Sequence, residues 1–170
     1  MSLLGMATDL VEAEVRFVIV GGLAARAHGS ARITEDLDIC YDTDAENVRR
    51  LARILRGWEA YPRGVERGLP FVLDERAFRT TPIMTLITAR GAIDVMDRVL
   101  GVGDYHDAFT RSVEVAYEDV RLRVLDLPAL IAAKRATGRP KDRDQLPELE
   151  ALLELREERP GESGTSTGSF

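Results

Sequence analysis

Two aspartates, Asp36 and Asp38, lie inside the apolar stretch "DLDICY" and constrain the fold more than any other feature of this sequence. The alternation of polar and apolar side chains predicts a β-strand over residues 36–41. Both carboxylates then face one side of the strand, while Leu37 and Ile39 face the core. No basic residue adjoins the two acids, which repel each other unless a cation lies between them. The stretch therefore predicts a strand with one buried face and one cation-binding face.

A third aspartate, Asp94 in "GAIDVM", has similar surroundings. The apolar stretches 83–88 and 92–96 flank Gly91, which predicts a β-hairpin. A lone aspartate at a strand end often only caps a turn. Three carboxylates on neighbouring strands, however, suit two divalent ions about 3.5–4 Å apart. Oxygen ligands favour Mg²⁺, with Mn²⁺ as the alternative ion.

The order of the other elements predicts an α+β fold, with a mixed β-sheet flanked by helices and further helices at the C-terminal end. Helices are predicted at 8–15 (capped by Thr8), 23–28, 128–138 and 144–158, and a further helix begins after a capping box of Thr43 and Glu46. Strands are predicted at 16–20 and 36–41, and hairpins at 83–96 and 112–127. Residues 1–158 are expected to form a single domain. The segment 159–170, rich in Gly, Ser and Thr, is expected to be a disordered tail.

Composition excludes several classes of protein. The chain of 170 residues has a net charge of −6, which argues against nucleic-acid binding through bulk electrostatics. No apolar run approaches the ~18–20 residues that cross a membrane, and the N-terminus has no secretion signal. The single cysteine, Cys40, cannot form an internal disulfide. We therefore expect a cytoplasmic protein that does not associate with membranes.

The distribution of basic residues is uneven. Only two of the 23 basic residues are lysines, Lys134 and Lys141, and both lie in the segment "AAKRATGRPKDRD". Lysine binds phosphate as a compact point charge, unlike the planar guanidinium of arginine. The segment is compatible with a phosphate-binding site, and equally with a chance cluster at a solvated helix end.

A dinucleotide-binding site is the first alternative for Gly21-Gly22, because the glycines follow the apolar run "VIV" and precede a helical segment. The G-x-G-x-x-G pattern fails, since Leu23 and Arg26 occupy the second and third glycine positions. The sequence also turns to hairpins where a doubly wound sheet requires alternating strands and helices. These departures argue against a dinucleotide site.

The combination of motifs resembles the DNA polymerase β-like nucleotidyltransferase superfamily. Its parts here are Gly21-Gly22, a gap over residues 23–35, Asp36-Leu-Asp38 and the later Asp94. The stretches "HGSARITEDLDI" and "IAAKRATGRPKDRD" further resemble minimal bacterial members, including toxins of toxin–antitoxin and abortive-infection systems. The resemblance covers residues 15–157 and implies a nucleotidyltransferase-like sheet. The family often has serine where Gly22 stands, so a hydroxyl contact is missing at this position.

The resemblance also implies roles for individual residues. Asp36 and Asp38 would bridge two Mg²⁺ ions, while Asp94 would bind the ion that activates the acceptor hydroxyl and could act as general base. Lys134 would extend from its helix toward the triphosphate, oriented by Asp142 or Asp144. The other expected nucleotide contacts are the backbone of Gly21 and Gly22, at a helix start that favours anions, and the side chains of Arg32, Thr34, Arg139 and Lys141.

Three functions fit this pattern. The first is Mg²⁺-dependent transfer of a nucleoside monophosphate from a nucleoside triphosphate such as ATP to an acceptor hydroxyl on tRNA or protein, by a toxin with a cognate antitoxin as its partner. The second is a small-molecule adenylyltransferase that modifies an antibiotic, since an acidic cleft attracts cationic drugs. The third is a non-catalytic module that keeps the fold and binds a partner.

Overall fold

The computed structural model describes residues 2–158, so the expected tail at 159–170 lies outside the described residues. The described strands are β1 (Phe17–Val20), β2 (Asp36–Tyr41), β3 (Tyr61–Pro62), β4 (Ile83–Thr88), β5 (Gly91–Met96), β6 (Arg98–Val99), β7 (Gly103–Asp104), β8 (Ser112–Tyr117) and β9 (Val120–Leu125). Seven of these form one sheet in the order β3-β4-β5-β2-β1-β9-β8, and β6 pairs with β7. The sheet is mixed, as predicted, because β2 runs antiparallel to β1 but parallel to β5.

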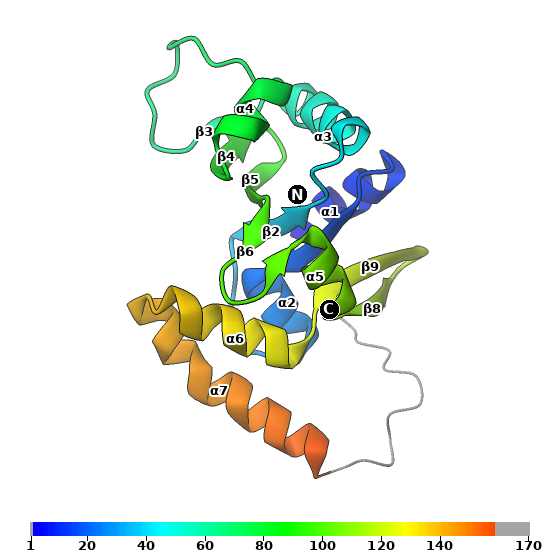
Figure 1. Ribbon diagram of the computed structural model, residues 1–170, viewed down its shortest axis with the longest axis vertical. Coiled ribbons are helices and arrows are strands. Elements are labelled where there is room, and N and C mark those ends of the chain that lie inside the picture. The colour runs from blue at the N-terminus through cyan, green and yellow to red at the C-terminus, as the bar shows by residue number, and fades with distance from the viewer. Residues whose placement is uncertain (1, 159–170) are drawn as a thin grey trace.

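Helices lie around this sheet and at its ends (Figure 1). They are α1 (Leu3–Glu12), α2 (Gly21–Ala27), α3 (Ala45–Gly57), α4 (Glu75–Thr80), α5 (Tyr105–Thr110), α6 (Leu127–Thr137) and α7 (Pro140–Glu157). Figure 1 places α3 and α4 beside the β3–β4 end and α6 with α7 at the opposite end of the molecule. The chain turns between α6 and α7 at Gly138, whose φ of 60° is left-handed. No described helix is long and apolar enough to cross a lipid bilayer.

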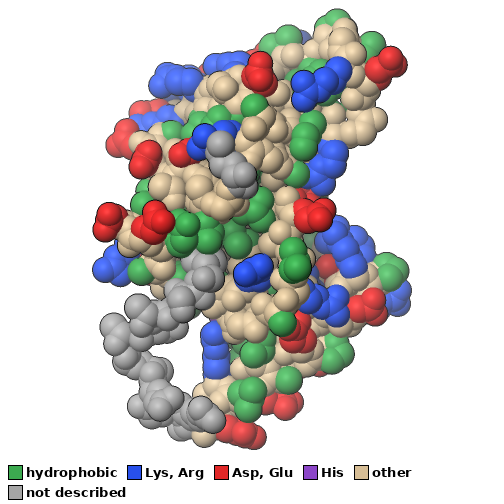
Figure 2. All heavy atoms as spheres, turned by 180° about the vertical axis from the view of Figure 1, so that it is seen from behind, with side chains coloured by type: hydrophobic (Ala, Val, Ile, Leu, Met, Phe, Trp, Pro, Cys, Tyr) green, Lys and Arg blue, Asp and Glu red, His purple; other side chains and the backbone are tan. Residues whose placement is uncertain are grey.

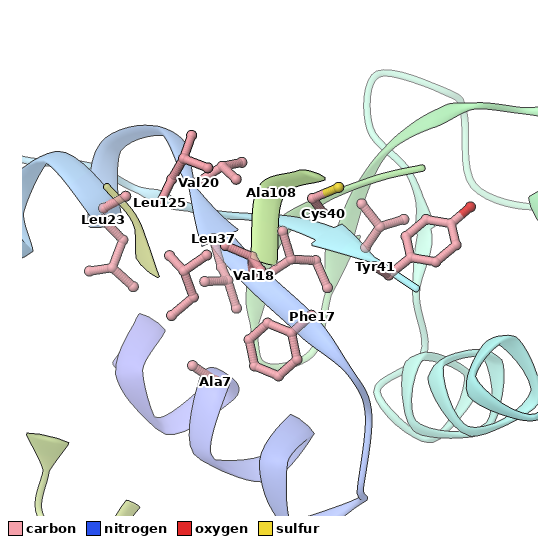
Figure 3. Packing of buried hydrophobic residues seen from close by; sticks show 14 of the residues in the cluster. Ala7, Phe17, Val18, Val20, Leu23, Leu37, Cys40, Tyr41, Ala108 and Leu125 are labelled. Carbon is pink, nitrogen blue, oxygen red and sulfur yellow. The ribbon is translucent and has the colours of Figure 1, made fainter. Parts of the chain in front are cut away.

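The core explains why β2 holds its acids on one face. Leu37 and Ile39 are fully buried, as predicted, and they lie beside the equally buried β1. Ala7 of α1 and Ala108 of α5 lie on opposite sides of this strand pair (Figure 3). A register shift of one residue would move both apolar side chains to the polar face and the aspartates into the core. Burial of the apolar side chains, about 1.5–3 kcal/mol each, therefore fixes the orientation of the acids.

The α+β fold class and the two C-terminal helices are confirmed, but the predicted starts of the first and third helices are wrong. The first helix begins at Leu3 and not at residue 8, because the Ser2 hydroxyl accepts the Gly5 N–H as the N-cap. α3 is capped by Asp44, one residue after the predicted cap Thr43. A carboxylate accepts the first helical N–H groups at least as well as a hydroxyl does.

Two short helices, α4 and α5, were not predicted, and the last helix is longer than expected. Each short helix has six residues and begins at an aspartate cap, Asp74 or Asp104. Helices this short present no full helical repeat of apolar residues, which explains why periodicity did not reveal them. The last helix begins at Pro140 and not at residue 144, since proline is favoured in the first helical turn.

Candidate nucleotide and metal site

The three aspartates come together at one place on the sheet. Asp38 on β2 pairs with Asp94 on β5, and Asp36 lies two residues earlier on the same face. One carboxylate oxygen from each of the three lies within 4.8 Å of the others. All three side chains are partly buried, so their charges repel in a medium less polar than water. The donor set, all hard oxygen at this spacing, fits divalent cations such as Mg²⁺ or Mn²⁺.

Two members of the triad have raised pKa values. Burial, followed by the charges of Asp36 and Asp94, raises the pKa of Asp38 to about 7, although the Gly22 N–H opposes the shift. Burial also raises the pKa of Asp94, against the opposing charge of Arg63. Burial, together with the neighbouring negative charges, therefore makes these two carboxylates hold protons more tightly than usual.

Arg63 supplies a positive charge to the triad. Its Nη2 donates a hydrogen bond of 2.8 Å to Oδ1 of Asp94, and its Nη1 lies 3.5 Å from Oδ2 of Asp36. The residue follows β3, and its backbone N–H donates to the carbonyl of Thr85 on β4. The sequence offered no motif for Arg63, which lies in a stretch without clear periodicity. The pairing of its guanidinium with two acids emerges only from the fold.

The Gly21-Gly22 turn approaches the triad closely. Gly21 has a φ of 64°, and a Cβ there would collide with the Asp38 carboxylate. A Cβ at Gly22 would lie 2.5 Å from Oγ1 of Thr34. The Thr34 hydroxyl donates to the carbonyl of Asp36 at 3.2 Å. Thr34 therefore fills the space beside Gly22, where a side chain such as serine would have to fit.

Two cations face the site from the corner between α6 and α7. Lys134 Nζ lies 3.3 Å from Oδ1 of Asp142, and Arg139 Nε donates to Oδ2 of Asp142 at 2.6 Å. The Thr137 hydroxyl donates to the same carboxylate at 2.9 Å. Burial alone would raise the pKa of Asp142, but these donors outweigh burial and lower the pKa to about 2. The ionised Asp142 thus orients both cations.

The loop before β2 is attached to α7. Glu148 accepts hydrogen bonds of 2.9 Å from the Ser30 hydroxyl and the Ala31 N–H. Arg32 Nη2 donates to the backbone carbonyl of Asp144 at 2.6 Å. These contacts join two segments more than 100 residues apart, and they hold the loop that leads into Asp36.

These parts surround a cavity of about 580 Å³, which we call the triad cavity. It is lined by Gly21, Gly22, Arg32, Ile33, Thr34, Glu35, Asp36, Asp38, Asp94, Lys134, Arg139, Lys141, Asp142 and Gln145. Lys141 is exposed at the cavity, and its side chain forms no ion pair or hydrogen bond within residues 2–158. The three carboxylates of the triad can hold a divalent ion. The four basic residues of the lining, Arg32, Lys134, Arg139 and Lys141, can bind a polyphosphate beside it.

Most residues singled out in the sequence line the triad cavity, with one exception. The exposed side chain of Asp144 is not part of the lining, and only its backbone carbonyl takes part, through Arg32. Asp142 is the acid that contacts Lys134. Gln145, which sequence reasoning missed, lines the cavity and donates to the Ser30 hydroxyl at 3.2 Å. Nothing in the local sequence marks a single glutamine on a helix as a site residue.

Comparison with known proteins supports the fold. No protein-family model and no curated protein matches the sequence. Six chains of solved structures match the fold. One is the crystal structure of the lincosamide antibiotic adenylyltransferase LnuA with lincomycin bound, at 14% sequence identity and a TM-score of 0.58. The match covers 88% of this chain and 95% of the other. The chain therefore has the nucleotidyltransferase fold that the motifs implied.

Proposed function

We propose that the protein is a metal-dependent nucleotidyltransferase, which moves a nucleoside monophosphate from a nucleoside triphosphate to an acceptor hydroxyl. The hydroxyl oxygen attacks the α-phosphorus, and a new P–O bond forms. The bond between the α-phosphorus and the oxygen bridging to the β-phosphorus breaks, and pyrophosphate leaves with the electron pair. The hydroxyl proton passes to the carboxylate of Asp94. The products are the nucleotidylated acceptor and pyrophosphate.

The observation that carries this proposal is the convergence of the acids beside a cation-lined cavity. Asp38 and Asp94 are side by side in the β2–β5 register, although 55 residues separate them along the chain. Buried carboxylates with a purely structural role need enough hydrogen-bond donors or basic side chains to offset burial and mutual repulsion. Those of Asp38 and Asp94 lack such a full set of partners, since their pKa values are raised. The fold shared with an antibiotic adenylyltransferase supports the same chemistry.

Each residue of the site has a role that follows from its position. Asp36, Asp38 and Asp94 would hold two Mg²⁺ ions, or Mn²⁺ ions in their place. Bound there, such ions neutralise the developing phosphate charge and lower the pKa of the acceptor hydroxyl. Lys134 and Arg139 bind the triphosphate from the α6–α7 corner. The Gly21-Gly22 turn lets the phosphates approach the backbone, and Arg32, Thr34 and Lys141 complete the phosphate side of the triad cavity.

A labelling experiment tests the proposal. The full chain is incubated with each α-³²P-labelled nucleoside triphosphate, Mg²⁺ or Mn²⁺, and three acceptor pools: total tRNA, total cell protein, and hydroxyl-bearing small molecules including antibiotics. We expect divalent-dependent labelling of one pool, which is lost with Asp94→Asn. Labelling of tRNA or protein would identify a toxin-like activity and direct the search for a cognate antitoxin.

Calorimetry with Mg²⁺ and each of the four nucleoside triphosphates provides the complementary measurement. Folded protein that labels no acceptor and binds none of the four nucleotides would overturn the proposal. That result would favour a non-catalytic module with a nucleotidyltransferase fold.

A further inference from the structure

A second cavity of about 370 Å³ adjoins the acid triad on the β4 side. Its lining is chiefly apolar and includes Ile83, Met96, Val99, Leu100 and Leu130. The two spaces meet at the carboxylates and at the α6–α7 corner, since both are lined by Gly21, Asp38, Asp94, Lys134, Arg139 and Asp142. We call this space the apolar cavity.

The sheet register places the apolar side chains directly beside the reacting acids. Thr85 on β4 pairs with Asp94 on β5, and Ile83 pairs with Met96 two residues further along. Side chains at alternate positions share a face, so these four side chains form one continuous surface. Leu130 of α6 contributes to the cavity from the helix that carries Lys134.

The mouth of the apolar cavity exposes hydrophobic surface to solvent. Ile83 is 56% exposed and Leu100 is 59% exposed, whereas Val99 and Leu130, which also line the cavity, are buried. Covering two such side chains is favourable by about 25 cal/mol for each Å² of apolar surface removed from water. A ligand with an apolar body would gain that free energy here.

Charge around the apolar cavity does not suit a polynucleotide. Its charged lining residues are three acids and three basic residues: Asp38, Asp94, Asp142, Arg98, Lys134 and Arg139. Two of the three basic residues are already bound to Asp142. On the face shown in Figure 2, basic and acidic side chains are interspersed over the surface. Nucleic-acid binding depends on many phosphate contacts, which the balanced lining of the apolar cavity does not supply.

We propose that the apolar cavity binds the acceptor, a small and largely apolar molecule that presents a hydroxyl group to Asp94. This inference rests on the proposed nucleotidyl transfer. In-line displacement needs the attacking and leaving oxygens on opposite sides of the α-phosphorus. Lys134 and Arg139 line both cavities, whereas Gly22, Arg32 and Lys141 line only the triad cavity. These three residues make the triad cavity the side for pyrophosphate. The acceptor then enters from the β4 side.

The test uses 4-(trifluoromethyl)benzyl alcohol, a neutral apolar alcohol that fluorine NMR detects directly. Titration into the full chain measures binding to wild-type protein and to Ile83→Lys and Leu100→Lys. Both residues are exposed, so the substitutions leave the buried core intact. Ile87→Lys is the matched control, because Ile87 is exposed on the same face of β4 but lines neither cavity. We expect saturable binding that weakens at least fivefold in both cavity variants and stays unchanged in the control.

Calorimetry with Mn²⁺ and ATP on the same variants separates the acceptor from the nucleotide. We expect an unchanged dissociation constant for ATP in Ile83→Lys and Leu100→Lys. A parallel loss of ATP affinity would assign the apolar cavity to the nucleotide and overturn the inference. Absence of saturable alcohol binding to wild-type protein would also overturn it, as would ³²P labelling of tRNA or protein that Leu100→Lys leaves intact. Failure of wild-type protein to bind any of the four nucleoside triphosphates would instead count against the proposed transfer.

Discussion

The guanidinium of Arg63 spans two acids of the triad, 2.8 Å from Asp94 and 3.5 Å from Asp36. Its positive charge lies at the carboxylates that we assign to divalent ions. One cation partly compensates three acidic groups, so the guanidinium and an incoming ion compete for the same oxygens. We expect Arg63 to give up at least one of these contacts when the acids coordinate a metal ion.

Arg63→Ala is therefore expected to bind Mn²⁺ more tightly than wild-type protein, by about tenfold or 1.4 kcal/mol. The stability of the metal-free protein should change by less than about 1 kcal/mol, because the ion pair is partly exposed. Titration calorimetry with Mn²⁺ measures the affinity. Arg67→Ala, an exposed arginine in the same segment, should bind like wild-type. Equal or weaker Mn²⁺ binding by Arg63→Ala would contradict the competition.

Removal of the expected base tests the chemistry. Asp94→Asn should lower the rate of nucleotidyl transfer by at least about 10²-fold, because the amide neither accepts the hydroxyl proton nor carries the charge that holds a divalent ion. Circular dichroism should show a folded protein, since the Asp94 carboxylate lies outside the hydrophobic core. Asp119→Asn, in the exposed β8–β9 turn, is the control. Transfer at the wild-type rate by Asp94→Asn would remove Asp94 from the mechanism.

The raised pKa of Asp38 predicts a pH dependence of stability. Burial and the two neighbouring acids raise this pKa to about 7 in the folded state. The pKa of aspartate in an unfolded chain is about 3.9. Between these values the folded state binds more protons than the unfolded state, so the free energy of unfolding falls as pH rises. Urea unfolding with a chelator at pH 5 and pH 7.5 should show this loss in wild-type protein. The loss should shrink in Asp38→Asn, and an identical loss there would refute the assignment.

The contact between Gly22 and Thr34 predicts a specific steric conflict. Gly22→Ser should destabilise the protein by about 1–3 kcal/mol, because its Cβ would lie 2.5 Å from the Thr34 hydroxyl. Thr34→Gly should relieve the conflict, so a double-mutant cycle in urea should give a coupling energy of about 1 kcal/mol or more. Gly57→Ser is the control, since a Cβ there meets no atom within 4 Å. Additive effects of the two substitutions would show that the site relaxes without Thr34.

Asp142 should be the most sensitive acid for stability. Its carboxylate is buried and accepts from three donors, so Asp142→Asn leaves two cations without a charged partner. We expect a loss of about 2–4 kcal/mol, measured by urea unfolding. Asp144→Asn, two residues later and exposed, should change stability by less than about 0.5 kcal/mol. Equal midpoints for the two variants would show that the corner does not depend on Asp142.

Sequence reasoning succeeded where a pattern has a direct geometric meaning. The alternation around Asp36 and Asp38 fixed their common face, and the hairpin pattern placed Asp94 on a strand. It could not predict that β2 and β5 are adjacent in the sheet, because strand order depends on packing between segments far apart in the chain. The resemblance to a known family supplied that expectation.

Contacts made by long side chains were beyond prediction for a similar reason. Arg63 and Gln145 reach the site, and Glu148 holds the loop before β2, from segments whose local sequence shows no functional motif. Asp142 and Asp144 looked equivalent in the sequence, and the helical turn at Pro140 decides between them. Side chains two positions apart on a helix face different directions, so only Asp142 turns toward Lys134.

The shared carboxylate at the α6–α7 corner affects the thermodynamics of ligand capture. A long basic side chain loses as much as about 2 kcal/mol of rotamer entropy when it is immobilised. Lys134 and Arg139 undergo that ordering during folding, since Asp142 already holds them. Their immobilisation adds little to the entropy lost when a nucleotide arrives, whereas Lys141 must be ordered at that moment. Preorganisation of this kind favours affinity without any additional contact.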